Sequence, residues 1–194
     1  MASKTIETRR ADSFGGISRD KNTRRLLVSP AEVRTLAVTG TWVLEANTNA
    51  VSLATNDVGG DGELLFVPCN VEASDMIVNG SSAVDRGIRV IGLEISYVVA
   101  ASALADIDFF LYKTTLDAEG AATAAAITAT TTFDTDGDTG REIDEHRVLV
   151  SIAEKDRFFL DGGTLVHGVI DMEDGTASDV NINSVIWHVQ RVEE

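Results

Sequence analysis

The sequence predicts an all-β protein, an antiparallel β-sandwich of jelly-roll type with an extended N-terminal arm. Three observations predict this class. Apolar residues recur with a period of two along many short segments. Turn signals rich in glycine, aspartate and asparagine separate those segments, and no amphipathic stretch of helical length lies between consecutive strands. Since a crossover between parallel strands needs about 12 residues or more, usually as a helix, we expect antiparallel pairing.

The length favours one compact domain. A chain of 194 residues with 44% hydrophobic residues can bury roughly two thirds of the surface that the unfolded chain exposes. We expect two parts, a basic flexible arm over residues 1–28 and an acidic β-sandwich domain over residues 29–194.

The arm is predicted from its charge. Residues 1–25 contain seven basic and three acidic residues, which gives +4, whereas the whole chain carries −15, so the remainder carries −19. Apolar residues are too sparse there to offset the entropy of ordering. We expect either a solvated leader or an arm that contacts a neighbouring, negatively charged subunit. Its basic residues are Lys4, Arg9, Arg10, Arg19, Lys21, Arg24 and Arg25.

The clearest strand runs from Arg89 to Val99. Apolar side chains at Ile91, Leu93, Ile95, Tyr97 and Val99 are expected on one face. Gly92, Glu94 and Ser96 are expected on the other. The same period predicts further strands, many of them rich in β-branched or aromatic residues. These are Ala37–Glu45, Glu63–Val67, Ile107–Thr114, Ile127–Phe133, Val148–Ile152, Arg157–Leu160, Leu165–Asp171 and Val185–Val189.

Two short helices are predicted as well. In Ser29–Leu36, Ser29 fits an N-cap, Pro30 fits the first turn and Glu32 completes a capping box. The second is the alanine-rich Ala118–Ala126, because alanine has the highest helix propensity. Neither is long enough to change the fold class.

One acidic segment has the spacing of a calcium loop. In residues 134–145, oxygen donors stand at alternate places and a glutamate at the twelfth, as in an EF-hand. The sixth place holds Thr139 in place of glycine, and the flanks are predicted strands, not helices. We keep two interpretations, a weak Ca²⁺ site and a solvated acidic hairpin connection. The candidate ligands are Asp134, Asp136, Asp138, Glu142 and Glu145.

No catalytic constellation is present in the sequence. His146, His167 and His188 match no zinc-ligand spacing, and Cys69 is a lone cysteine expected to be a small buried side chain. Nucleophile elbows, phosphate loops and dinucleotide-binding turns are absent. We therefore expect a protein that is not an enzyme and has no cofactor apart from possible Ca²⁺; a carboxylate enzyme has the least support.

Charge and hydropathy narrow the partners. The net charge of −15 argues against nucleic-acid binding, which needs a dense basic surface. The N-terminus lacks the apolar core of a secretory signal, and no apolar stretch is long enough to cross a bilayer. We expect a soluble protein made in the cytoplasm, without a membrane partner.

Two stretches carry a resemblance, Gly92–Val99 with the sequence GLEISYVV and Asp106–Leu116 with the sequence DIDFFLYKTTL. With the basic arm and acidic body, the chain resembles the β-sandwich virion proteins of bacteriophages and related viruses. The resemblance implies a capsid or decoration subunit in a virion assembled in a host cytoplasm. It also implies a homo-oligomer, trimeric or larger, whose arm contacts neighbouring subunits and other capsid proteins. It supplies no catalytic residues.

A second hypothesis is a Ca²⁺-dependent carbohydrate-binding or adhesion β-sandwich. In that case residues 134–145 would hold the ion, and aromatic side chains are expected to be exposed at strand ends or loop tips.

Overall fold

We describe a computed structural model of the chain. It describes residues 23–37, 40–46, 51–55, 58, 63–69, 87–116, 119–127, 141–157, 164–173 and 178–192. Among these residues, apart from the 3-10 turns η1 (Pro30–Glu32) and η3 (Glu154–Asp156), the regular elements are strands. These strands are β1 (Thr23–Val28), β2 (Arg34–Ala37), β3 (Val43–Ala46), β4 (Val51–Thr55), β5 (Glu63–Pro68), β6 (Gly87–Ala100), β7 (Asp106–Leu116), β8 (Ala122–Ala126), β9 (Asp144–Ser151), β10 (Thr164–Glu173) and β11 (Asp179–Val192).

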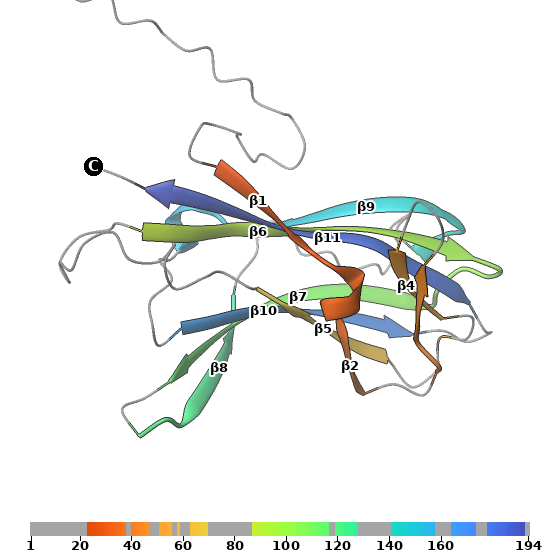
Figure 1. The fold of residues 1–194 in the computed structure, drawn as a ribbon, viewed down its shortest axis with the longest axis horizontal. Helices are drawn as coiled ribbons and strands as arrows, with labels where there is room; N and C mark the ends of the chain where they lie inside the picture. The colour runs from red at the N-terminus through yellow and green to blue at the C-terminus, as the bar shows by residue number, and fades with distance from the viewer. Residues whose placement is uncertain are drawn as a thin grey trace, which may run out of the picture.

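The strands form two layers (Figure 1). Over the described residues, one sheet has six strands in the order β3-β4-β11-β6-β9, with β1 also paired to β11, and the other has five in the order β2-β5-β10-β7-β8. Every pairing is antiparallel. The predicted all-β antiparallel sandwich is confirmed.

The last eight strands follow the order of a jelly roll. Strands β4 to β11 divide into the runs β4-β11-β6-β9 and β5-β10-β7-β8, so that most connections cross from one sheet to the other. Such connections need no helix. In the described part of the chain, no helix is long and apolar enough to span a membrane.

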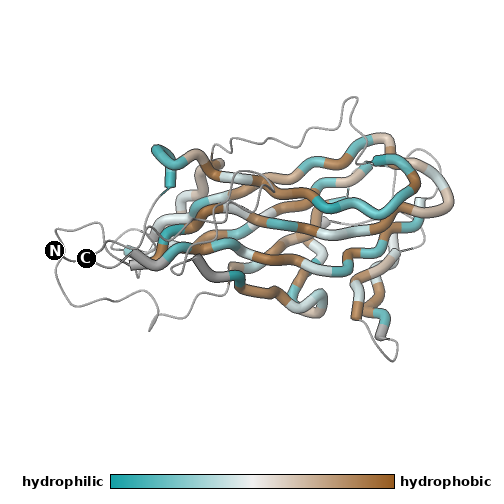
Figure 2. Tube along the Cα trace, turned by 90° about the horizontal axis from the view of Figure 1, so that it is seen from above, coloured by the Kyte–Doolittle hydropathy of each residue, from teal (hydrophilic) through white to brown (hydrophobic). Residues whose placement is uncertain are grey.

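The core lies between the sheets. Hydropathy alternates along the strands (Figure 2), because successive side chains point to opposite faces. Trp187 on β11 is fully buried and donates a hydrogen bond of 2.8 Å from its indole Nε1 to the carbonyl oxygen of Pro68, at the end of β5. This contact joins the two sheets and satisfies the one polar atom of the largest buried side chain.

The predicted arm of residues 1–28 overlaps the sandwich. Residues 23–28 form β1, which pairs with β11 of the same chain from Thr23 opposite Gln190 to Val28 opposite Val185. Val28 is buried in the core and Leu26 packs against it. The sandwich therefore begins by residue 23, and Arg24 and Arg25 belong to it. Lys4, Arg9, Arg10, Arg19 and Lys21 lie outside the described residues.

The predicted helix Ser29–Leu36 is wrong in length but right at its start. Ser29 Oγ accepts a hydrogen bond from Ala31 N, and the Glu32 carboxylate accepts one from Ser29 N, so the capping box is present. Val33 is already extended, and the chain continues into β2 of the other sheet. The turn moves the chain from one layer to the next.

Two other predictions needed correction. The predicted strand Ala37–Glu45 is divided between β2 and β3, which belong to different sheets. The predicted helix Ala118–Ala126 is wrong, since Ala122–Ala126 is β8 and pairs with β7. A helix that short cannot repay its nucleation cost, whereas strand pairing satisfies the backbone at once.

Two predicted strands are described only at their first residues. Ile127 follows β8 and Arg157 follows η3, and neither lies in a strand. The remainders of Ile127–Phe133 and Arg157–Leu160 lie outside the described residues. The other predicted strands correspond to β5, β6, β7, β9, β10 and β11.

A β-bulge changes one predicted face of β6. The register with β11 shifts between His188 and Val189, which leaves Ile91 without a directly opposite residue. Leu93, Ile95, Tyr97 and Val99 face the core as predicted, but Ile91 packs with Leu149 outside the main core.

Candidate functional site

Four rings lie in a row on the outer face of the five-stranded sheet. We call this set the ring row: Phe66 on β5, His167 on β10, and Tyr112 and Phe110 on β7. These residues alternate with buried neighbours such as Leu65, Val67, Phe109 and Leu111, which turn the other way into the core. The row thus extends across three adjacent strands.

Register explains why the rings meet. His167 stands directly opposite Tyr112, and Val169 stands between Phe66 and Phe110 in the next row. The ring centroids are 5.0 Å apart for Phe66 and His167, and 5.4 Å apart for His167 and Tyr112, whose planes differ by only 17°. Tyr112 and Phe110 are 6.4 Å apart.

The rings remain accessible from solvent. Phe110 is 38% exposed, and Phe66, Tyr112 and His167 are half-buried. Burial lowers the pKa of His167 below its ordinary value of 6.5, so its ring is neutral at pH 7. The row is therefore an uncharged aromatic surface at neutral pH.

Carboxylates border the row on one side. Asp171 on β10 stands directly opposite Asp108 on β7, and this pair lies two residues along the strands from the pair Val169 and Phe110. Glu173 stands opposite Asp106. Burial, with the neighbouring charges of Asp106 and Glu173, raises the pKa of Asp171. The outer face of this sheet thus combines apolar rings with hydrogen-bond acceptors.

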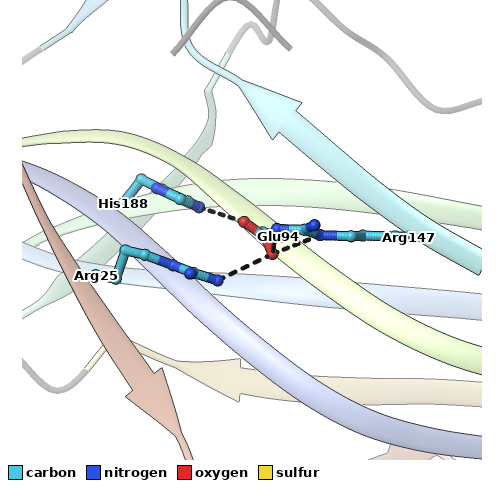
Figure 3. Close-up of polar contacts among 4 residues, drawn as sticks. All are labelled: Arg25, Glu94, Arg147 and His188. Carbon is cyan, nitrogen blue, oxygen red and sulfur yellow. Dashed lines mark hydrogen bonds and ion pairs between the residues drawn. The ribbon is translucent and has the colours of Figure 1, made fainter. Parts of the chain in front are cut away.

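A buried carboxylate organises the outer face of the other sheet. We call Glu94, Arg25, Arg147 and His188 the Glu94 cluster (Figure 3). Glu94 on β6 is only 2% exposed. Its Oε1 accepts hydrogen bonds from Arg25 Nη2 at 3.2 Å and Arg147 Nε at 2.8 Å, and its Oε2 lies 2.7 Å from His188 Nε2.

The Glu94 cluster joins four neighbouring strands, because its members come from β1, β11, β6 and β9. Burial by itself would raise the pKa of Glu94, but the hydrogen bonds and charges of His188 and Arg147 outweigh burial, and the pKa is lowered. The carboxylate is enclosed by its own partners. We assign the cluster to the stability of the sheet, not to ligand binding.

Acid is expected to weaken the fold through Glu94. The carboxyl group of Glu94 binds protons more tightly in the unfolded chain than in the folded one. Its contribution to the free energy of unfolding is therefore complete above pH 4.5, the ordinary pKa of Glu, and is lost as the pH falls through the lowered pKa of the folded state. Urea unfolding of the wild type and Glu94→Gln from neutral pH downward tests this. The difference in unfolding free energy between the wild type and Glu94→Gln should become smaller below pH 4.5. A difference that stays constant with pH would contradict the prediction.

The three histidines and Cys69 each contact other residues of the fold. His146 contacts the carbonyl oxygen of Glu142 at 2.7 Å, while His188 and His167 belong to the two groups above. Cys69 packs against the core, and burial raises the pKa of its thiol to about 12, which leaves the thiol protonated at pH 7.

The predicted calcium ligands are described only in part. Asp134, Asp136 and Asp138 lie outside the described residues, whereas Glu142 and Glu145 are exposed. Among the residues that the structure describes, no group of three or more His, Cys, Asp or Glu side chains is placed to hold a metal ion. The calcium site stays a prediction.

Sequence reasoning missed the ring row. It expected aromatic side chains at strand ends or loop tips, but the rings lie within the strands. Alternation in Leu64–Val67 and Asp108–Tyr112 would have placed each ring on the face opposite the core. Only the register of β5, β10 and β7 brings them together.

Comparison with known proteins gives similar folds only. No protein-family model and no curated protein matches the chain. Among solved structures, the xylan-binding CBM22-1 domain of Xyn10C from Paenibacillus barcinonensis is 10% identical, with a TM-score of 0.41 over 86% of this chain and 89% of that one. TmCBM27, a mannan-recognising carbohydrate-binding module, is 13% identical, with a TM-score of 0.42 over 87% and 99%.

A viral protein is also similar. The enzymatically active domain of bacteriophage CBA120 tailspike protein 4 is 9% identical, with a TM-score of 0.35 over 89% of this chain but 20% of that one. At these identities and scores the likeness concerns the β-sandwich arrangement and says nothing about ligands. Any functional conclusion must rest on the residues themselves.

Proposed function

We propose that this protein binds carbohydrate through the ring row. The observation that carries the proposal is the presence of four accessible rings on one open sheet face, in contact from strand to strand. Single exposed apolar residues are normal on a protein surface, but a contiguous aromatic patch marks a binding surface.

The chemistry of the surface suits a sugar. One face of a pyranose ring carries C–H groups that pack against aromatic rings, while its hydroxyl groups donate hydrogen bonds at the rim. The rings of Tyr112 and His167 supply the apolar surface, and Asp108 and Asp171 supply acceptors beside it. A neutral His167 avoids placing a desolvated charge under an apolar ligand face.

Tyr112→Ala should weaken glycan binding about tenfold or more, since Tyr112 contacts the rings on either side of it and truncation removes stacking area. A glycan array identifies the ligand, and titration calorimetry with the best glycan measures the effect. Leu27→Ala is the matched control, because Leu27 is an apolar residue exposed on the other sheet. Its affinity should equal that of the wild type.

Two results would overturn the proposal: no binding to any glycan, or equal affinity in the wild type and Tyr112→Ala. Repeating the titration with a chelator tests the predicted calcium requirement separately. Loss of binding on chelation, restored by added Ca²⁺, would support a site in residues 134–145. Unchanged binding would remove calcium from the proposal and leave the ring row in place.

The virion role is the second candidate, and the strand order is compatible with it. Jelly rolls occur in viral coat proteins and in lectins, so the order β4-β11-β6-β9 with β5-β10-β7-β8 is compatible with either role. The two proposals differ in what they require. A coat or decoration subunit must associate with its own copies or with other coat proteins, whereas the ring row needs only a glycan.

A further inference from the structure

The six-stranded sheet ends in an open strand. β3 pairs with β4 on one side, and no other strand of the described chain lies on its far side. Val43 and Leu44 on β3 are 47% and 50% exposed, although they point to opposite faces. The strand carries neither lysine nor proline, which are common means of blocking an edge against pairing. The geometry is that of an acceptor for an additional strand.

An open depression lies beside this edge on the outer face. It has a volume of about 390 Å³ and is lined by Thr41, Val43, Glu45, Ala54, Thr55, Asp179 and Asn181. Two of these residues, Glu45 on β3 and Asp179 on β11, are carboxylates. Within the described part of the chain, no lysine, arginine or histidine forms an ion pair with either. The edge therefore presents uncompensated negative charge next to apolar surface.

Complementary charge is present in the same chain. Residues 1–22 contain five basic residues and three acidic ones, a net of +2, and since the chain carries −15, residues 23–194 carry −17. Copies of such a body repel one another unless a positive segment or bound cations offset the charge. The N-terminal segment is thus the part of this chain whose charge suits the depression.

We infer that residues 1–22 of one copy add as a strand to β3 of a second copy, with a basic side chain beside Glu45. An added strand lies about 4.8 Å from its neighbour, so it would form main-chain hydrogen bonds to β3. Side chains on one face of the added strand would then pass Val43 and Glu45, and those on the other face would meet Leu44. Asp179 strengthens the negative potential from two strands away.

Placement favours a second copy over the same chain. β1 begins opposite Gln190, whereas the depression lies around Asn181, and this stretch of β11 spans roughly 30 Å. In Figure 1, β1 begins near the end of β11, and β4 lies toward the other end of the sandwich. A segment that precedes Thr23 leaves the sheet at the far end from its own β3. To reach its own β3, that segment would have to reverse direction and return along the sandwich, whereas 22 extended residues, which reach roughly 70 Å, can pass directly to a neighbouring molecule.

Charge exchange in the 194-residue chain tests this inference. Glu45→Lys should weaken self-association at least tenfold, and so should the double variant Arg9→Glu with Arg10→Glu. A mixture of the two variants should restore association, because the negatively charged N-terminal segment of one variant can then pair with the positively charged β3 edge of the other. Sedimentation velocity at moderate and high salt gives the masses, and the wild-type mass should fall as salt screens the contact.

The control is Glu145→Lys, which reverses an exposed glutamate on β9 at the opposite edge of the same sheet. It should associate as the wild type does. Zero-length carboxyl–amine cross-linking of isotope-labelled and unlabelled protein that carries Arg9→Lys and Arg10→Lys should join Glu45 to position 9 or 10 of another molecule. The inference fails if the wild type is a monomer at every concentration, if Glu45→Lys and Glu145→Lys behave alike, or if the cross-links form within one chain. None of these outcomes bears on glycan binding.

Discussion

The Glu94→Ala variant is expected to lose about 3–5 kcal/mol of unfolding free energy, the usual cost of removing one partner from a buried ionic group. His188, itself 3% exposed, would face a cavity where a carboxylate oxygen now lies 2.7 Å away. Arg25 and Arg147 would lose the same acceptor. Urea unfolding at neutral pH measures the change.

The effect should be largest at the N-terminal strand. Arg25 is the side chain by which β1 contacts Glu94, so amide exchange in β1 should accelerate more than exchange in β10 of the other sheet. Glu145→Ala is the control, because Glu145 is exposed on β9, and its substitution should change stability by less than about 0.5 kcal/mol. A Glu94→Ala protein as stable as this control would show that the cluster contributes nothing.

The fold class was predictable because alternation is a local signal. In β6, Leu93, Ile95, Tyr97 and Val99 recur at every second position, and all four are buried. The face of Ile91 was not predictable, because the bulge that turns it outward depends on the register with β11, a strand far along the chain. A local pattern predicts which face of a strand each side chain occupies, but it does not predict where a bulge interrupts the alternation.

Both groups in the candidate site depend on contacts between distant strands. Glu94 and Ser96 were expected on the outer face, but nothing near Glu94 in the sequence indicates that Arg25 and His188 meet there. The ring row likewise combines β5, β7 and β10, which are not successive in the chain. Periodicity predicts the sheet face on which each side chain lies, whereas strand pairing determines which side chains it contacts. In a jelly roll the paired strands are far apart in the sequence.

The wrong helix at Ala118–Ala126 shows how context overrides propensity. Alanine favours helix in isolation, yet Ala126 stands opposite Tyr112 at the edge of the five-stranded sheet. The five residues of β8 are all exposed. Small exposed side chains leave little packing to indicate a strand in advance, so the sequence contained no signal for the pairing that forms.

Gly92→Ala should be more damaging than a methyl group added at Gly168, the other buried glycine whose surroundings the structure describes. A Cβ at Gly92 would overlap the carbonyl oxygen of Val150 and stand 3.2 Å from the Cα of Ser151, both of them backbone atoms of the paired strand β9. Backbone in a central strand pair cannot move without loss of ladder hydrogen bonds. We expect a loss of about 3 kcal/mol in unfolding free energy, at the upper end of overpacking costs.

Gly168→Ala is the matched comparison, because it also adds one methyl group inside the sandwich. Its Cβ would meet Leu93 Cδ2 at 2.6 Å and Val67 Cβ at 3.4 Å. The nearest atom is the end of a leucine side chain, which can change rotamer, so we expect a smaller loss of about 1 kcal/mol. Thermal and urea unfolding of both variants measure which substitution causes the larger loss of unfolding free energy. Equal losses, or a larger loss for Gly168→Ala, would mean that the β6–β9 backbone yields more easily than the packing between the sheets.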